Sequence, residues 1–173
     1  AIEARGDMDM FWELFDERME IMREALLFRI DRCEDATPEN APILYKYGAF
    51  GKRATAEETD VKKFFRGQRA TVSVGYIGLY EAATMFYGSD WEQDPEAKDF
   101  TFEILRAMNR YTDQWKKDYP YWFSVYATPS ESLTDRFNRL DREKFGEISH
   151  VTDKDYYTNS FHYPVWLKPT PME

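Results

Sequence analysis

One stretch of the chain limits its possible folds more than any other, because a strand-like segment there runs directly into a helix-like one. Residues 122–127 are mostly aromatic or β-branched, a composition that favours buried strands. Thr128 then suits the N-cap of a helix, Pro129 its first turn, and Glu131 the reciprocal position of a capping box. Gly146 suits the end of the helix. The sequence therefore predicts a strand followed at once by a helix.

A helix that begins at the carboxyl end of a strand is a candidate anion-binding site. Its first N–H groups have no acceptor within the helix, and the positive end of the helix dipole faces outward. If the Thr128 hydroxyl caps the helix, the N–H groups of Ser130 and of the residues near Leu133 remain for a ligand, and the hydroxyls of Ser130 and Ser132 add donors. The residues alone also fit a well-capped helix with no ligand, so both interpretations remain open.

The rest of the chain alternates helical and strand-like patterns. Helices are expected over residues 7–35, 55–67, 80–87, 94–118 and 129–146, and strands over 70–79, 122–127 and 157–165. Residues 42–50 form a short apolar segment of ambiguous type. This order predicts an α/β fold with parallel strands and right-handed helical crossovers. Residues 1–173 show no linker or internal repeat, so we expect a single segment without an internal domain boundary.

Two glycines interrupt the strand pattern of residues 70–79. Gly75 and Gly78 would weaken an ordinary strand, so each is expected at a bulge or where another part of the backbone approaches closely. Their spacing does not match a dinucleotide-binding fingerprint. A packing role is favoured, and a ligand-facing role stays open where this strand meets the next helix.

The balance of charge opposes several classes of partner. The chain has 32 acidic and 23 basic residues and a net charge of −9, which disfavours non-specific binding to nucleic acid or to anionic membranes. It has one cysteine and no apolar run of about 18 residues, the minimum for a membrane-spanning helix. We therefore expect a cytoplasmic protein without membrane or nucleic-acid partners, in which any polyphosphate must bind at a local site.

The residues that most often carry catalysis or metals give weak signals. Cys33 lies beside Glu34 and Asp35, which disfavour the thiolate, so a structural role is expected. His150 and His162 are far apart and have no cysteine or carboxylate at a ligand spacing. We expect neither a metal site nor a cofactor in this segment.

Several stretches together resemble one known family. They are residues 124–137 (SVYATPSESLTDRF), 145–146 (FG), 151–154 (VTDK), 156–162 (YYTNSFH), 41–49 (APILY and a later Gly-Ala) and 71–81 (TVSVGYIGLYE). In their order along the chain, these stretches are similar to those of the anaerobic, class III ribonucleoside-triphosphate reductases. The resemblance covers nearly the whole chain and implies a piece of a much larger enzyme.

The resemblance also implies a fold and site residues. Such units form half of a ten-stranded α/β barrel in this family. A loop at a helix N-terminus holds the substrate phosphates there, and the residues that match it are Thr128, Pro129, Ser130, Glu131 and Ser132. Tyr126 matches a tyrosine of the active-site strand, where its hydroxyl would lie near the sugar. A core tyrosine with a satisfied hydroxyl is the alternative.

The implied function is the conversion of ribonucleoside triphosphates to deoxyribonucleoside triphosphates by glycyl and thiyl radical chemistry. The parent would use a glycyl radical, a structural zinc and ATP or dNTP effectors, and would act as a homodimer with a radical-SAM activating enzyme. The matching motifs do not include the radical-bearing cysteine and glycine segments, so this segment alone is expected to be inactive. The alternative is a non-catalytic truncated relative that binds a nucleotide or a partner.

Overall fold

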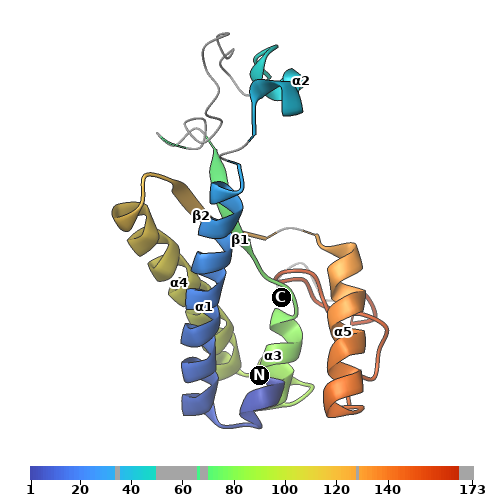
Figure 1. Cartoon of the computed structure of the whole chain (residues 1–173). Helices are drawn as coiled ribbons and strands as arrows, with labels where there is room; N and C mark the ends of the chain where they lie inside the picture. Colours follow the sequence, from blue (N-terminus) through green and yellow to red (C-terminus); the bar gives the residue numbers. More distant parts are fainter. Residues whose placement is uncertain (34–35, 50–65, 67–69, 128, 168–173) are drawn as a thin grey trace.

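The computed structural model describes residues 1–33, 36–49, 66, 70–127 and 129–167. The elements in chain order are η1 (Ile2–Ala4), α1 (Met8–Asp31), η2 (Pro38–Asn40), α2 (Pro42–Tyr45), β1 (Thr71–Gly75), α3 (Leu79–Tyr87), η4 (Trp91–Gln93), α4 (Pro95–Asp118), β2 (Trp122–Tyr126) and α5 (Glu131–Phe145) (Figure 1). The predicted helix over residues 55–67 falls almost entirely outside the described residues.

The two long helices begin where their capping residues predict. The side chain of Asp7 accepts a hydrogen bond from the Met10 N–H (3.0 Å) at the start of α1. Asp94 accepts one from the Glu96 N–H (2.9 Å) at the start of α4, where Pro95 is the first helical residue. These local contacts confirm both predicted helix starts.

The strands form a small parallel sheet that confirms the α/β prediction in its coarse form. Thr71 pairs with Trp122 and Gly75 pairs with Tyr126, so the two strands end together. The connection between them passes through α3 and α4, as a parallel pair requires. β1 and β2 are the two paired strands of the described residues. A pair this small is marginal without further packing, so its buried face is important.

That buried face packs on the helical layer formed by α1 and α4. Val72, Val74 and Phe123 point into the core, and Phe123 contacts the ring of Trp115 on α4 with centroids 5.5 Å apart. Further aromatic contacts connect α1 with α3 and α4. They involve Phe11, Trp12, Phe15, Phe86, Phe100 and Tyr111. In Figure 1, α5 lies on the other side of β1 and α3 from this layer.

The prediction of a third strand over residues 157–165 was wrong. That segment is irregular, with short turns at residues 160–161 and from 165 and one isolated bridge between Ile77 and Asn159. Ser160 has a positive φ of 48°, which interrupts an extended run. The alternation of polar and apolar residues that resembled a strand comes from side chains that form separate hydrogen bonds, described below.

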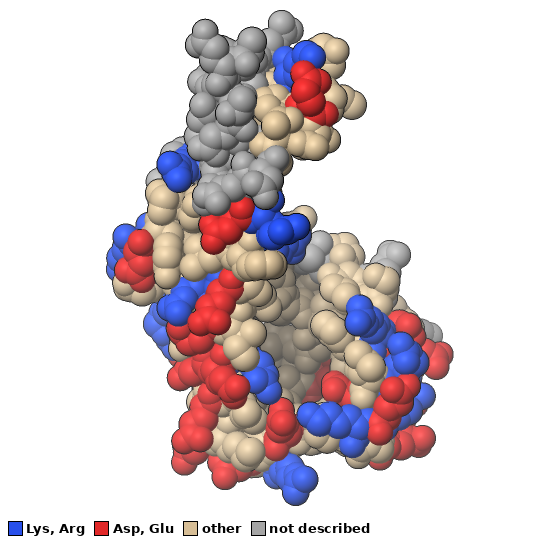
Figure 2. Space-filling view, in the orientation of Figure 1, with Lys and Arg blue, Asp and Glu red and all other residues tan. Residues whose placement is uncertain are grey.

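None of the helices in the part of the chain that the structure describes combines the length and apolar character needed to cross a bilayer. Acidic and basic side chains are interspersed over the face shown in Figure 2, around a hollow lined mainly by uncharged residues.

Candidate functional site

Three segments far apart in sequence meet at the carboxyl end of the parallel strands. The Gly78 N–H, just after β1, donates to the Thr158 carbonyl oxygen (2.8 Å). The Ser130 N–H, just before α5, donates to Oδ1 of Asn159 (2.8 Å). Residues 158–159 therefore join the end of β1 to the turn that follows β2. In open α/β sheets, ligands bind preferentially at this edge.

The helix after β2 begins later than predicted. α5 starts at Glu131 with Ser130 as its N-cap, so the predicted start at Pro129 was two residues too early. The Ser130 carbonyl accepts hydrogen bonds from the N–H groups of both Leu133 (2.9 Å) and Thr134 (3.0 Å). The Ser130 side chain makes no cap hydrogen bond. Thr128, the predicted N-cap, lies outside the described residues.

The amides that the sequence left for a ligand are partly engaged. The Ser130 N–H is bonded to Asn159 and the Leu133 N–H to Ser130, so the prediction that both remain available was wrong. The N–H groups of Glu131 and Ser132, at the start of α5, have no acceptor within the helix. The Ser132 side chain is exposed beside them. Backbone groups in this arrangement can bind an anion without any lysine or arginine.

Tyr126 ends β2 on the face of the sheet opposite to the core. It is 55% exposed, so in this chain it is not a core residue. Ser124 is on the same face, and its hydroxyl lies 3.4 Å from the hydroxyl of Ser73 on β1. Trp122 lies on this face too, because alternate residues of a strand point to the same side, so the second face carries both hydroxyl and aromatic side chains. Tyr126 is the last residue of β2, just before the turn at residues 129–132.

The buried carboxylate of Glu81 anchors residues 154–158 to α3, a contact that the sequence did not predict. Glu81 is 3% exposed, and it accepts hydrogen bonds from the Thr158 N–H (3.0 Å) and the Thr158 hydroxyl (2.7 Å). It also pairs with the Lys154 ammonium, which lies over the Tyr80 ring at 5.4 Å from its centroid. The one available signal was a glutamate within the apolar run of residues 79–87, because such a residue is rarely buried unless paired.

Arg142 of α5 holds the same segment from the other side. Its Nε donates to the Thr152 carbonyl (2.6 Å), and its Nη2 donates to the Lys154 carbonyl and to Oδ1 of Asn138 (3.3 Å). Thr152 is fully buried, and its hydroxyl donates to the Gly146 carbonyl (2.9 Å). The loop after α5 is thus fixed between α3 and α5 by polar contacts.

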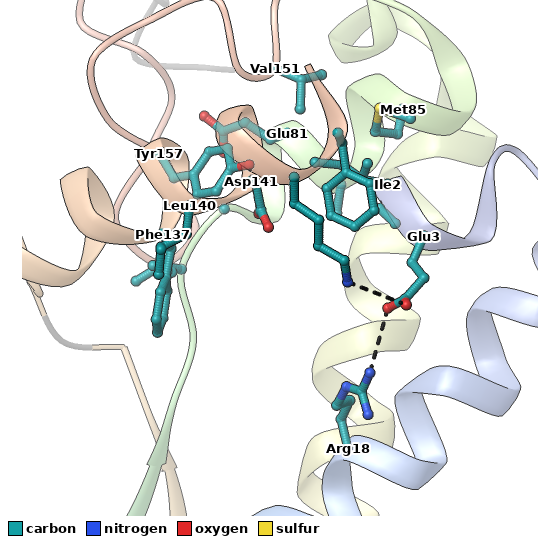
Figure 3. Close-up of a pocket in the computed structure, with 16 residues that line it drawn as sticks. Ile2, Glu3, Arg18, Glu81, Met85, Phe137, Leu140, Asp141, Val151 and Tyr157 are labelled. Carbon is teal, nitrogen blue, oxygen red and sulfur yellow. Dashed lines mark hydrogen bonds and ion pairs between the residues drawn. The ribbon is translucent and has the colours of Figure 1, made fainter. Parts of the chain in front are cut away.

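A cavity lies away from this turn, between the N-terminal segment, α3 and α5. Its volume is about 640 Å³ (Figure 3). Tyr157 and Asp141 lie on its wall, with the tyrosine hydroxyl donating to Oδ2 of Asp141 (2.9 Å). Burial, followed by this hydrogen bond, raises the pKa of Tyr157 above its ordinary value. Because Tyr126, Ser130 and Ser132 are not among its lining residues, this cavity is distinct from the predicted site.

Cys33 and His162 each contact a backbone carbonyl oxygen nearby in the sequence. The Cys33 thiol donates to the Arg29 carbonyl (3.4 Å) at the end of α1. Nδ1 of His162 lies 2.9 Å from the Asn159 carbonyl oxygen, within a turn and not within the predicted strand. Among the residues that the structure describes, no group of three or more His, Cys, Asp and Glu side chains could hold a metal ion.

Comparison with known proteins identifies the family. The profile of the anaerobic ribonucleoside-triphosphate reductase family matches residues 1–173. The chain is 46% identical over 176 residues to the anaerobic ribonucleoside-triphosphate reductase of Escherichia coli, covering 100% of this chain and 24% of that protein. The chain is also 42% identical to the reductase of Haemophilus influenzae, covering 100% of this chain and 24% of that protein. It is 42% identical to the reductase of Enterobacteria phage T4, covering 94% of this chain and 25% of that protein. The chain thus spans about a quarter of the length of these relatives. It belongs to the anaerobic ribonucleoside-triphosphate reductase family.

Proposed function

We propose that this chain is part of the catalytic domain of an anaerobic ribonucleoside-triphosphate reductase and that its residues 128–132 bind the substrate triphosphate. The observation that carries the proposal is the start of α5 at the carboxyl edge of a parallel sheet, with the first-turn amides of Glu131 and Ser132 lacking an acceptor within the helix. The helix dipole adds to the attraction for an anion. Such a site also suits a chain with a net charge of −9, because it needs no basic cluster.

Tyr126 would then belong to the wall of the active site. It is the last residue of β2 before the turn, and its side chain is exposed on the sheet face opposite to the core. A sugar attached to a phosphate at the turn would lie beside this face, within reach of the tyrosine hydroxyl. The reduction expected of this family removes the ribose 2′-hydroxyl, and it would take place on the side of the sugar that faces Tyr126.

A larger barrel would account for what the two strands leave uncovered. Leu133, Phe137 and Leu140 form the apolar stripe of α5 and are exposed. Apolar stripes on soluble helices are normally buried against another element. We propose that the rest of the parent chain, completing a ten-stranded α/β barrel, covers this stripe and both edges of the sheet.

The remaining machinery would come from outside this segment. It comprises the glycyl radical, the radical-bearing cysteine, a structural zinc, the ATP or dNTP effector sites, a radical-SAM activating enzyme and a second subunit. This chain, as a single segment without an internal domain boundary, would contribute binding and orientation in the cytoplasm. It would give no deoxynucleotide when incubated alone with substrate and an activating enzyme, and turnover under those conditions would contradict the proposal.

The test of the phosphate site is a comparison of two variants at the first helical position. Glu131→Pro removes the N–H at a position where proline is favoured, whereas Glu131→Ala keeps it. Loss of one charge-assisted hydrogen bond of about 1.5–3 kcal/mol would weaken binding of a ribonucleoside triphosphate by roughly 10- to 100-fold. The measurement is isothermal titration calorimetry of the chain. Equal affinities for the proline and alanine variants would contradict an amide-bound phosphate, and a site with no triphosphate affinity would leave a partner-binding module as the function.

A further inference from the structure

The turn before α5 is held by a side chain from elsewhere in the chain. Asn159 presents Oδ1 to the Ser130 N–H at 2.8 Å, from a position 29 residues later in the sequence. Its carbonyl oxygen also accepts from the His162 N–H (2.9 Å), which fixes its own turn. The residue therefore contacts the backbone of the proposed phosphate turn directly.

Asn159 is itself held by the buried carboxylate of α3. Thr158, its neighbour, gives both its N–H (3.0 Å) and its hydroxyl (2.7 Å) to Glu81. The Thr158 carbonyl accepts from the Gly78 N–H (2.8 Å), so both backbone polar groups of Thr158 are hydrogen-bonded. The Lys154 ammonium pairs with the same carboxylate, so Glu81 contacts this segment at a second point.

We infer that Glu81 and Asn159 are positioning residues for the phosphate turn. Glu81 fixes Thr158, Thr158 carries Asn159, and Asn159 holds the Ser130 amide so that the next two amides face outward together. Neither side chain needs to touch the substrate. The inference rests on the proposed function in taking the turn as a phosphate site. The dependence of the Ser130 amide on Glu81 and Asn159 can be tested without that assumption.

The coupling can be measured without any ligand, by hydrogen exchange of the Ser130 amide in the 173-residue chain. Asn159→Ala should raise its exchange rate by about tenfold or more, because its acceptor is lost. Glu81→Gln and the milder Thr158→Val should raise the same rate, although neither residue contacts Ser130. The Val74 amide in β1 serves as an internal reference for global loosening, and Asn109→Ala on the exposed side of α4 serves as the control variant. Unchanged exchange at Ser130 in Glu81→Gln and Thr158→Val would overturn the inference.

A charge variant separates holding the turn from binding the ligand. Asn159→Asp keeps an oxygen acceptor for the Ser130 N–H, so protection of that amide should persist, but it places a negative charge beside the triphosphate. Affinity for a ribonucleoside triphosphate should therefore fall by about tenfold or more at low salt and recover partly at high salt. Asn159→Ala should also bind more weakly, and tighter binding would show that Asn159 competes with the ligand, which contradicts a positioning role. If the unaltered chain binds no triphosphate, the proposed function fails, while the exchange rates still decide whether Glu81 positions the turn.

Discussion

The most demanding prediction concerns the buried pair of Glu81 and Lys154. Their side chains are only 4% and 12% exposed. Replacing Glu81 by leucine leaves the ammonium group without its countercharge and the Thr158 N–H and hydroxyl without their acceptor. Breaking a buried pair from one side costs about 3–5 kcal/mol. At about 2–4 °C per kcal/mol for a chain of this size, the midpoint of thermal unfolding should fall by roughly 6–20 °C.

The double variant tests the origin of that loss. Glu81→Leu combined with Lys154→Met removes both charges, so the cost of the unpaired ammonium disappears and only the cost of the unsatisfied Thr158 groups, which both variants share, remains. The double variant should be more stable than Glu81→Leu alone, although it removes more of the native contacts. The assay is urea unfolding followed by tryptophan fluorescence, with the four corners of the double-mutant cycle measured together. If the losses of stability in the two single variants simply add in the double variant, the unpaired ammonium is not the main cause of the loss in Glu81→Leu. The control is Arg139→Met, which breaks the exposed pair with Glu143.

Three further predictions follow from single contacts. Gly78→Ala should lower the free energy of unfolding by about 1–2 kcal/mol, because φ is +72° there. The new Cβ would make no clash, since its nearest neighbour, Glu81 Oε2, lies at 3.6 Å. An unchanged midpoint of urea unfolding would contradict this prediction. Burial and the hydrogen bond to Asp16 raise the pKa of Tyr111 to about 12. The stability that this group contributes is therefore complete below about pH 10 and is lost as the pH rises toward 12. If Tyr111→Phe left the ultraviolet titration of the tyrosines unaltered, the raised pKa would be contradicted. Arg142→Met removes the donor to two loop carbonyls and should cost about 1–3 kcal/mol and speed proteolytic cleavage within residues 146–156, whereas unaltered cleavage would exclude that anchoring.

The parts of the fold that depend on neighbouring residues could be predicted from the sequence. Asp7 and Asp94 start their helices, and Gly88 ends α3 with a positive φ of 88°, as the local pattern indicates. Gly78 has a positive φ of 72°, which favours glycine, whereas the expected close approach of another backbone segment is absent, because a Cβ there would meet its nearest neighbours at 3.6–3.8 Å. In each case the partner lies within a few residues or the backbone requires glycine.

The errors fall where a distant partner decides the structure. The start of α5 moved to Glu131 in a turn whose Ser130 amide is bonded to Asn159, and no local cap pattern reveals a contact 29 residues away. The expected strand over residues 157–165 is irregular because Thr158 gives its N–H and its hydroxyl to Glu81, 77 residues earlier, and pairing with the backbone after β1 is limited to one bridge at Asn159. Polar and apolar alternation shows which side chains are buried but not what they are buried against.

The central claim is that backbone amides at the start of α5 bind the triphosphate, and a crystal structure of the chain soaked with a ribonucleoside triphosphate tests it most directly. The account predicts phosphate oxygens within about 3 Å of the Glu131 and Ser132 nitrogens, with the sugar toward Tyr126 and the Ser130 amide still on Asn159. A triphosphate bound instead in the cavity between α3 and α5, or a turn that stays empty at saturating ligand, would contradict it.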